Sequence, residues 1–243
     1  MNSYPCSECK RECLSELVGT YLLVLIGPGM VIAVSLFPNL SPLIALTIVG
    51  LSFGCTVAVI IGTLGKYSTH INPAITVAHA FAGVIRQRLL IPYVGFQILG
   101  GLLAGLTLRL LFQSLDSATY FGSTNLATGI GPFAGIFLEA VGTLSLSLVV
   151  LLTATHVEGL KRQAFLVGTT LFILILLIGP LTGASFNPAR SFGPSTASGY
   201  FAYHYVYWIG PLTGGVVGAF LFKTIQNYAR GKDGRGERIV CMR

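Results

Sequence analysis

Charged residues are what this sequence has least of. Only 9% of its 243 residues are charged, 53% are hydrophobic, and the mean hydropathy is +0.78. No formal charge interrupts residues 17–65, and the later uncharged runs cover 89–108, 117–138, 140–157, 163–189 and 191–222. A soluble domain of this length could not bury so much apolar surface, so the composition predicts a polytopic membrane protein.

Two further absences narrow the kind of membrane protein. The apolar runs lack the alternation of apolar and polar residues that membrane β-strands show, so they are predicted to be helices. Residues 1–16 lack an apolar stretch that ends in a small-residue cleavage site, so the run from Leu17 is predicted to be a span and not a signal peptide. Six spans are expected, at roughly 14–36, 43–64, 89–112, 132–153, 163–180 and 204–226.

The net charge of +7 does not indicate a nucleic-acid partner, because the basic residues lie between and after the spans. Six spans would place nearly all of them on one side of the bilayer and leave only Arg109 and Arg190 toward the other. The positive-inside rule then predicts an integral protein with both termini in the cytoplasm, and we expect it in the plasma membrane. The residues on that side are Lys10, Arg11, Lys66, Arg86, Arg88, Lys161, Arg162, Lys223, Arg230, Lys232, Arg235, Arg238 and Arg243.

One triplet occurs twice, as Asn72-Pro73-Ala74 and as Asn187-Pro188-Ala189. An isolated Asn-Pro usually marks only a turn, but here each copy lies between long apolar segments. Proline is favoured at the first position of a helix, because its missing N–H has no partner there in any case. Each triplet is therefore predicted to begin a short helix.

Other features also recur, which indicates an internal duplication. The segment from Glu16 to Thr20 returns as Glu139 to Thr143. Because each half holds three spans, the second half enters the membrane from the opposite side, and the two short helices should meet near the midplane with their N-termini facing. The predicted organisation is a cytoplasmic tail (1–13), a channel domain (14–228) made of two repeats (about 14–113 and 132–228), and a basic cytoplasmic tail (229–243).

Charged residues within membrane spans usually have a purpose. Glu16 and Glu139 occupy matching places, and the spans offer no further titratable groups to link them into a proton relay. We therefore interpret both as structural acids that accept hydrogen bonds from the backbone of a re-entrant segment. Arg190 has two interpretations, a fixed charge lining a narrow water-filled pore or a buried ion pair with a distant Glu, and we favour the pore.

These features together resemble the aquaporin (major intrinsic protein) family, from about residue 14 to 228. The resemblance implies an all-α membrane fold of six transmembrane helices plus two re-entrant half-helices, with an inverted repeat, assembled as a homotetramer in the lipid bilayer. It also implies that Asn72 and Asn187 donate hydrogen bonds to water at the centre of a pore. Arg190 would join three other residues in an outer selectivity filter, namely Phe53, Ile175 and Ala184.

The resemblance predicts a passive channel for water, driven by osmotic gradients and excluding protons and ions, with no enzymatic activity and no cofactor. Water-selective members generally carry His where this chain has Ile175, so the filter is similar to that of archaeal-type members and should be wider. Glycerol or another small neutral solute is therefore expected as a second substrate, although Ser191 and the pair Tyr207-Trp208 resemble water-channel members. The alternative is a secondary transporter of a small neutral solute, which would need coupling groups where this chain has neutral Asn.

The histidines and cysteines carry weaker predictions. His70 is expected to line the cytoplasmic vestibule, where it is a candidate pH-sensitive gate, whereas His79 is expected at the membrane interface. Four cysteines lie in the predicted tails or beside them, and they allow either a metal site or, as we favour, ordinary reduced thiols. They are Cys6, Cys9, Cys13 and Cys241. No metal is predicted.

Overall fold

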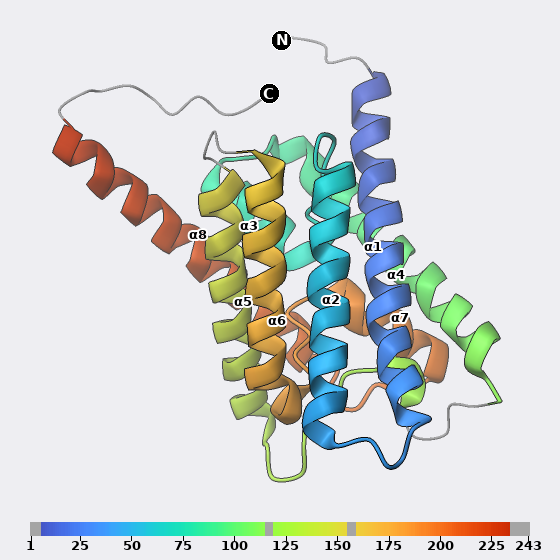
Figure 1. Ribbon diagram of the computed structural model, residues 1–243. Coiled ribbons are helices and arrows are strands. Elements are labelled where there is room, and N and C mark those ends of the chain that lie inside the picture. Colours follow the sequence, from blue (N-terminus) through green and yellow to red (C-terminus); the bar gives the residue numbers. More distant parts are fainter. Residues whose placement is uncertain (1–5, 115–118, 155–158, 234–243) are drawn as a thin grey trace.

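The structure is a computed structural model that describes residues 6–114, 119–154 and 159–233, the side chains of 6–8 and 230–233 excepted. Within these ranges it holds eight α-helices, two short 3-10 helices and no strand (Figure 1). The elements are α1 (Cys6–Ser35), α2 (Pro42–Leu64), α3 (Pro73–Ala82), η1 (Gln87–Leu89), α4 (Leu90–Phe112), η2 (Tyr120–Gly122), α5 (Pro132–Ala154), α6 (Leu160–Thr182), α7 (Pro188–Ser198) and α8 (Val206–Asp233).

Six of the helices are long and apolar enough to cross a membrane, which confirms the predicted spans. The boundaries differ most at the ends of the chain. The first helix begins at Cys6 and the last ends at Asp233, whereas the expected spans begin near 14 and end near 226. A helix that the bilayer has already nucleated extends into polar flanks easily, because each added residue gains a backbone hydrogen bond.

The two remaining α-helices, α3 and α7, are the predicted half-helices. Each begins directly after Asn, with Pro as its first residue. Each ends at a glycine in the left-handed conformation, Gly83 and Gly199, both with φ of 76°. Glycine adopts this conformation without steric cost, so each half-helix has a defined start and a defined stop.

Each half-helix packs against a long helix of the other repeat. Helix α1 packs on α4 and α5 packs on α8, which is the same pairing in each repeat. However, α3 of the first repeat packs mainly on α8, and α7 of the second packs mainly on α4. Neither repeat can therefore bury its own half-helix without the other. The Cys6 end of α1 and the Asp233 end of α8 lie on the same side of the bundle (Figure 1).

Glycines make these close approaches possible. A Cβ on Gly101 of α4 would lie 2.5 Å from the carbonyl oxygen of Ala189, in the second Asn-Pro-Ala. A Cβ on Gly215 of α8 would lie 2.6 Å from the carbonyl oxygen of Ala74, in the first. Real Cβ atoms do not come so close to backbone, so both positions require glycine if the half-helices are to seat fully.

We predict that Gly101→Ala destabilises the protein, because the added methyl group must displace the backbone of α7. Overpacking of this kind costs about 1–3 kcal/mol. Gly95→Ala on the same helix is the matched control, since nothing lies within 4 Å of a Cβ there. Thermal unfolding in detergent, followed by circular dichroism, should show a lower midpoint for Gly101→Ala only. Equal midpoints would contradict the packing described.

Candidate functional site

Each Asn of the two triplets caps its own half-helix. The Asn72 Oδ1 accepts a hydrogen bond from the Ala74 N–H at 2.8 Å. The Asn187 Oδ1 accepts from the N–H groups of Ala189 at 3.0 Å and Arg190 at 3.3 Å. The cap fixes the orientation of the amide, because its oxygen turns toward the helix and its NH2 group turns away from it.

The same two side chains join the half-helices to each other. The Asn72 Nδ2 donates to the Phe186 carbonyl at 2.7 Å, and the Asn187 Nδ2 donates to the Ile71 carbonyl at 2.8 Å. Ile71 and Phe186 have φ of 45° and 53°, a left-handed conformation that costs such residues on the order of 1–3 kcal/mol each. A primary amide has two N–H donors, so each Asn keeps one for another acceptor.

Two buried carboxylates hold the segments that lead into the half-helices. Glu16 accepts from the backbone N–H groups of His70 at 2.8 Å and Ile71 at 2.6 Å. Glu139 accepts from the equivalent N–H groups, those of Ser185 at 3.0 Å and Phe186 at 2.7 Å. Side chains complete both sets: Ser68 and Gln97 donate to Glu16, and Thr182 donates to Glu139. Both acids are fully buried.

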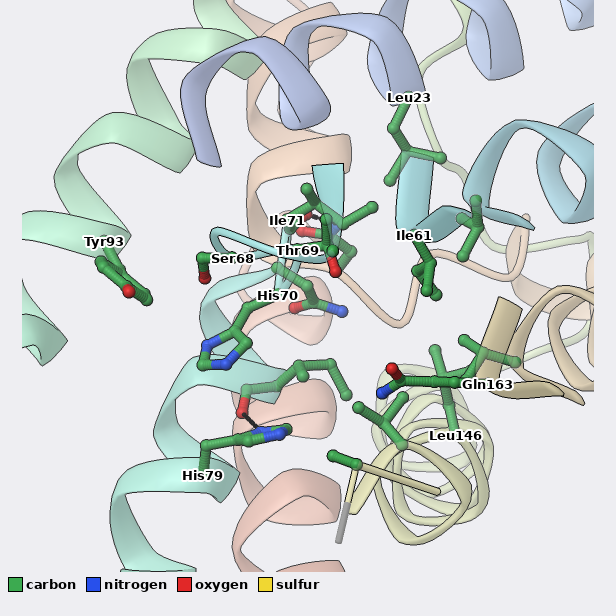
Figure 2. Close-up of a pocket in the computed structure, with 18 of the residues that line it drawn as sticks. Leu23, Ile61, Ser68, Thr69, His70, Ile71, His79, Tyr93, Leu146 and Gln163 are labelled. Atoms are coloured by element: carbon green, nitrogen blue, oxygen red, sulfur yellow. Dashed lines mark hydrogen bonds between the residues drawn. The ribbon is translucent and has the colours of Figure 1, made fainter. Parts of the chain in front are cut away.

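A cavity of about 580 Å³ runs past this junction. Its wall includes Glu12, Arg86, both Asn residues and Arg190. Figure 2 shows that the wall has two unlike sides. His70 and His79 lie on the α3 side, and Ile61 and Leu146 lie across from them. A small molecule in this cavity would meet polar groups on the α3 side and mainly hydrocarbon across from it, where Gln163 is a polar exception.

The expected filter residues lie near one another, but they do not all face the cavity. Phe53, Ala184 and Arg190 are in its wall. Ile175 is 4% exposed, and it lies in the apolar cluster that also contains Phe53 and Ala184. The Arg190 guanidinium carbon lies 5.1 Å from the centre of the Phe53 ring.

Arg190 is not held by an acid. In the part of the chain that the structure describes, the ion pair within 4.0 Å joins Arg86 to Glu12. The Arg190 Nη1 donates to the Gly122 carbonyl at 2.8 Å, and its Nε–H has no hydrogen-bond partner among the described residues. Sequence reasoning missed Gly122, because nothing in the chain's pattern links that loop to α7.

His79, which was expected at the membrane interface, is buried within the protein. The residue is 3% exposed, and its ring lies against that of His70, with centroids 4.2 Å apart and planes tilted by 31°. Its Nδ1 lies 2.8 Å from the carbonyl oxygen of Ile75, so this nitrogen carries the proton. Helical spacing could have indicated this position, because Asn72, Thr76 and His79 share one face of α3.

The cysteines that the structure describes form no metal site. Cys9 and Cys13 are free thiols on α1. The Cys6 side chain and all of Cys241 lie outside the described residues. Across the described ranges, no cluster of three His, Cys, Asp or Glu residues could hold a metal ion.

We predict that Glu139→Ala strongly destabilises the protein, because it leaves the N–H groups of Ser185 and Phe186 without an acceptor. Each buried unpaired group costs about 1–3 kcal/mol. Glu12→Ala is the control, since it removes a partly exposed ion pair that contributes about 0–1 kcal/mol. Thermal unfolding should separate the two variants clearly. A Glu139→Ala midpoint no lower than that of Glu12→Ala would show that the carboxylate does not hold this segment.

Comparison with known proteins agrees with this geometry. The family model for the major intrinsic proteins matches residues 4–222. Aquaporin TIP4-4 of Zea mays is 37% identical, with 88% of this chain and 86% of that protein covered. Aquaporin NIP1-1 of Zea mays is 36% identical, with 89% of this chain and 75% of that protein covered.

The fold is also found among solved structures. The aquaglyceroporin of Plasmodium falciparum has a TM-score of 0.81 to this structure at 22% sequence identity, and the match covers 92% of this chain and 99% of the other. Two Asn-capped half-helices meet beside the cavity, and the match to the family model and to these relatives shows that the chain belongs to the major intrinsic protein family, the aquaporins.

Proposed function

We propose that this chain is a passive water channel that excludes protons and ions and also passes glycerol or a similar small neutral solute. The observation that carries the proposal is the meeting of two half-helix N-termini at Asn72 and Asn187, both of which line the cavity. Family membership already makes the protein a channel and not an enzyme. The selectivity is what the proposal adds.

The proposed mechanism is electrostatic, as in aquaporin-type pores generally. Each half-helix carries about half a positive charge at its N-terminus, so two of them at one place repel cations and hydrated protons. The free N–H of each Asn donates to the oxygen of a central water molecule. That molecule can then only donate outward, and its neighbours on the two sides are oriented in opposite directions. A continuous proton wire is thereby interrupted while water passes.

The proposed filter is formed by Phe53, Ile175, Ala184 and Arg190. Arg190 supplies a permanent charge and several hydrogen-bond donors in a fixed plane. Its Nε–H is buried and has no hydrogen-bond partner among the described residues. Ala184 lies in the cavity wall and Ile175 lies in the same apolar cluster, so neither adds a polar group to the proposed opening. This combination supports passage of a solute that presents hydroxyl groups on one face and carbon on the other.

A secondary transporter is the alternative, and it is less well supported. Coupling to an ion gradient needs titratable or charged groups near the midplane that can change their partners. Glu16 and Glu139 are fully buried and already accept backbone hydrogen bonds. Swelling of proteoliposomes in sucrose and in glycerol gradients separates the two classes. A channel shows low activation energy and no saturation, whereas a carrier saturates.

The proposed setting is the plasma membrane, with both termini in the cytoplasm and four protomers in a homotetramer. Lys66, Arg86 and Lys161 lie in segments on the same side as the chain ends, which supports this orientation. The channel domain covers 14–228, between tails 1–13 and 229–243. His70 then lines the cytoplasmic vestibule, where protonation would place a charge in the path of water. Family membership supports the tetramer.

We predict that Arg190→Val raises glycerol and urea flux by about tenfold, the factor that corresponds to about 1.4 kcal/mol, and allows protons to leak, with little change in water flux. Removing the guanidinium widens the opening and at the same time removes the positive charge and the hydrogen-bond donors. Arg109→Val is the matched control, because that side chain donates to the Ala197 carbonyl at the far end of α7. Solute uptake and a pH-sensitive dye in liposomes of equal protein content report both effects. Wild-type behaviour of Arg190→Val would mean that the proposed constriction is wrong.

We also predict that Ile175→His lowers glycerol flux more than water flux, because the imidazole narrows the filter and adds a polar partner. The two fluxes are compared by stopped-flow light scattering at matched expression. Gly179→Ala, one helical turn farther along α6, is a control for disturbed packing. An equal loss of both fluxes in Ile175→His would show that residue 175 does not border the pathway.

A further inference from the structure

The position of the Arg190 side chain depends on a residue far away in the sequence. Its Nη1 donates to the Gly122 carbonyl at 2.8 Å, and no described acid lies within 4.0 Å of it. The guanidinium carbon also lies 5.1 Å from the centre of the Phe53 ring. Where the charge lies in the filter is therefore set largely by where Gly122 lies.

Gly122 lies in a segment that does not hold its own shape. Tyr120, Phe121 and Gly122 have φ of 48°, 55° and 74°, so three successive residues are left-handed. Bulky residues seldom adopt this conformation, and it persists only where the surroundings enforce it. A Cβ on Gly122 would lie 2.6 Å from the Pro28 carbonyl oxygen, so the segment is pressed against α1 and needs glycine there.

Tyr200 is the residue that holds the segment from outside. Its ring stacks on the Tyr120 ring, with centroids 4.1 Å apart and planes 12° from parallel. Its hydroxyl donates to the Asn125 Oδ1 at 2.9 Å. Tyr200 thus contacts the loop both before Gly122, at Tyr120, and after it, at Asn125. Tyr200 directly follows Gly199, the glycine that ends α7, and Arg190 lies near the start of that same half-helix.

Two hydroxyl pairs continue the contact along α7. Thr124 Oγ1 lies 2.8 Å from Ser191 Oγ, and Ser123 Oγ lies 3.3 Å from Ser198 Oγ. These polar pairs also hold the loop, and Thr124 is buried, whereas the stacked tyrosine Tyr120 is 47% exposed. Substituting the tyrosines should therefore loosen the loop with the least disturbance of the buried contacts.

We propose that Tyr120 and Tyr200 form a latch that positions Arg190 through the Gly122 carbonyl, and that this latch sets the size of solute that the channel admits. The inference rests on the proposed function, since it concerns the same filter. Neither tyrosine is in the cavity wall, so both are positioning residues. With the latch closed, the guanidinium stays across the filter. With the latch open, Gly122 moves away, the guanidinium loses its acceptor, and the opening widens.

The test compares the ratio of glycerol to water permeability in proteoliposomes. Tyr200→Ala and Tyr120→Ala should each raise this ratio by about two- to tenfold. This is the factor by which losing one aromatic pair shifts the equilibrium between the closed and the open latch. Tyr120→Phe keeps the stacked ring and should stay at the wild-type ratio. Tyr205→Ala, at an exposed tyrosine in the same region, is the control for general disturbance.

A double variant separates positioning from a merely structural effect. If the latch acts through Arg190, adding Tyr200→Ala to Arg190→Val should leave the ratio of Arg190→Val unchanged. A further additive increase would overturn the proposal. Wild-type ratios in both alanine variants, with Arg190→Val raised, would also overturn it while the proposed channel stands. If Arg190→Val itself has no effect, the proposed filter fails instead. Should Tyr200→Ala not fold, the exposed Tyr120 supplies the same comparison.

Discussion

The structure depends on one exchange of hydrogen bonds: each Asn caps its own half-helix and donates to the backbone that leads into the other. A helix that stops halfway across a bilayer leaves backbone groups with no water to bind. Glu16 and Glu139 accept the N–H groups of the two re-entrant segments, and each Asn accepts the first N–H of its helix. Both Asn residues line the cavity, and the second N–H of each amide is the donor that the proposed channel uses.

The exchange also explains why the two repeats cannot be separated. Each half-helix packs on the last helix of the other repeat, through a glycine that touches the alanine of an Asn-Pro-Ala. The proline and alanine of that triplet are then as important as the asparagine. Proline gives up an N–H that would have no partner, and alanine allows its carbonyl to touch Gly101 or Gly215. The Asn-Pro-Ala motif therefore first allows a half-helix to be buried within the bundle, in addition to its proposed role in selectivity.

Much of this follows from the sequence, and the remainder does not for identifiable reasons. Hydropathy and the internal duplication predict the six spans and the half-helices. They also predict that Glu16 and Glu139 occupy equivalent places in the two repeats. The role of Gly122 could not be predicted, because it depends on a left-handed loop folding back onto α7. The burial of His79 against His70 could not be predicted either, because it depends on how the segment before α3 folds back over that helix.

The central claim is that two opposed half-helices form the barrier to cations at Asn72 and Asn187. The most direct test is the cation conductance of Asn187→Asp in planar bilayers, with Asn187→Ala as the uncharged control. Aspartate keeps an oxygen to cap α7, but it places a negative charge where two dipoles now repel cations. We expect a cation leak in Asn187→Asp that exceeds that of Asn187→Ala. An inserted, water-conducting Asn187→Asp with no increased conductance would contradict the claim.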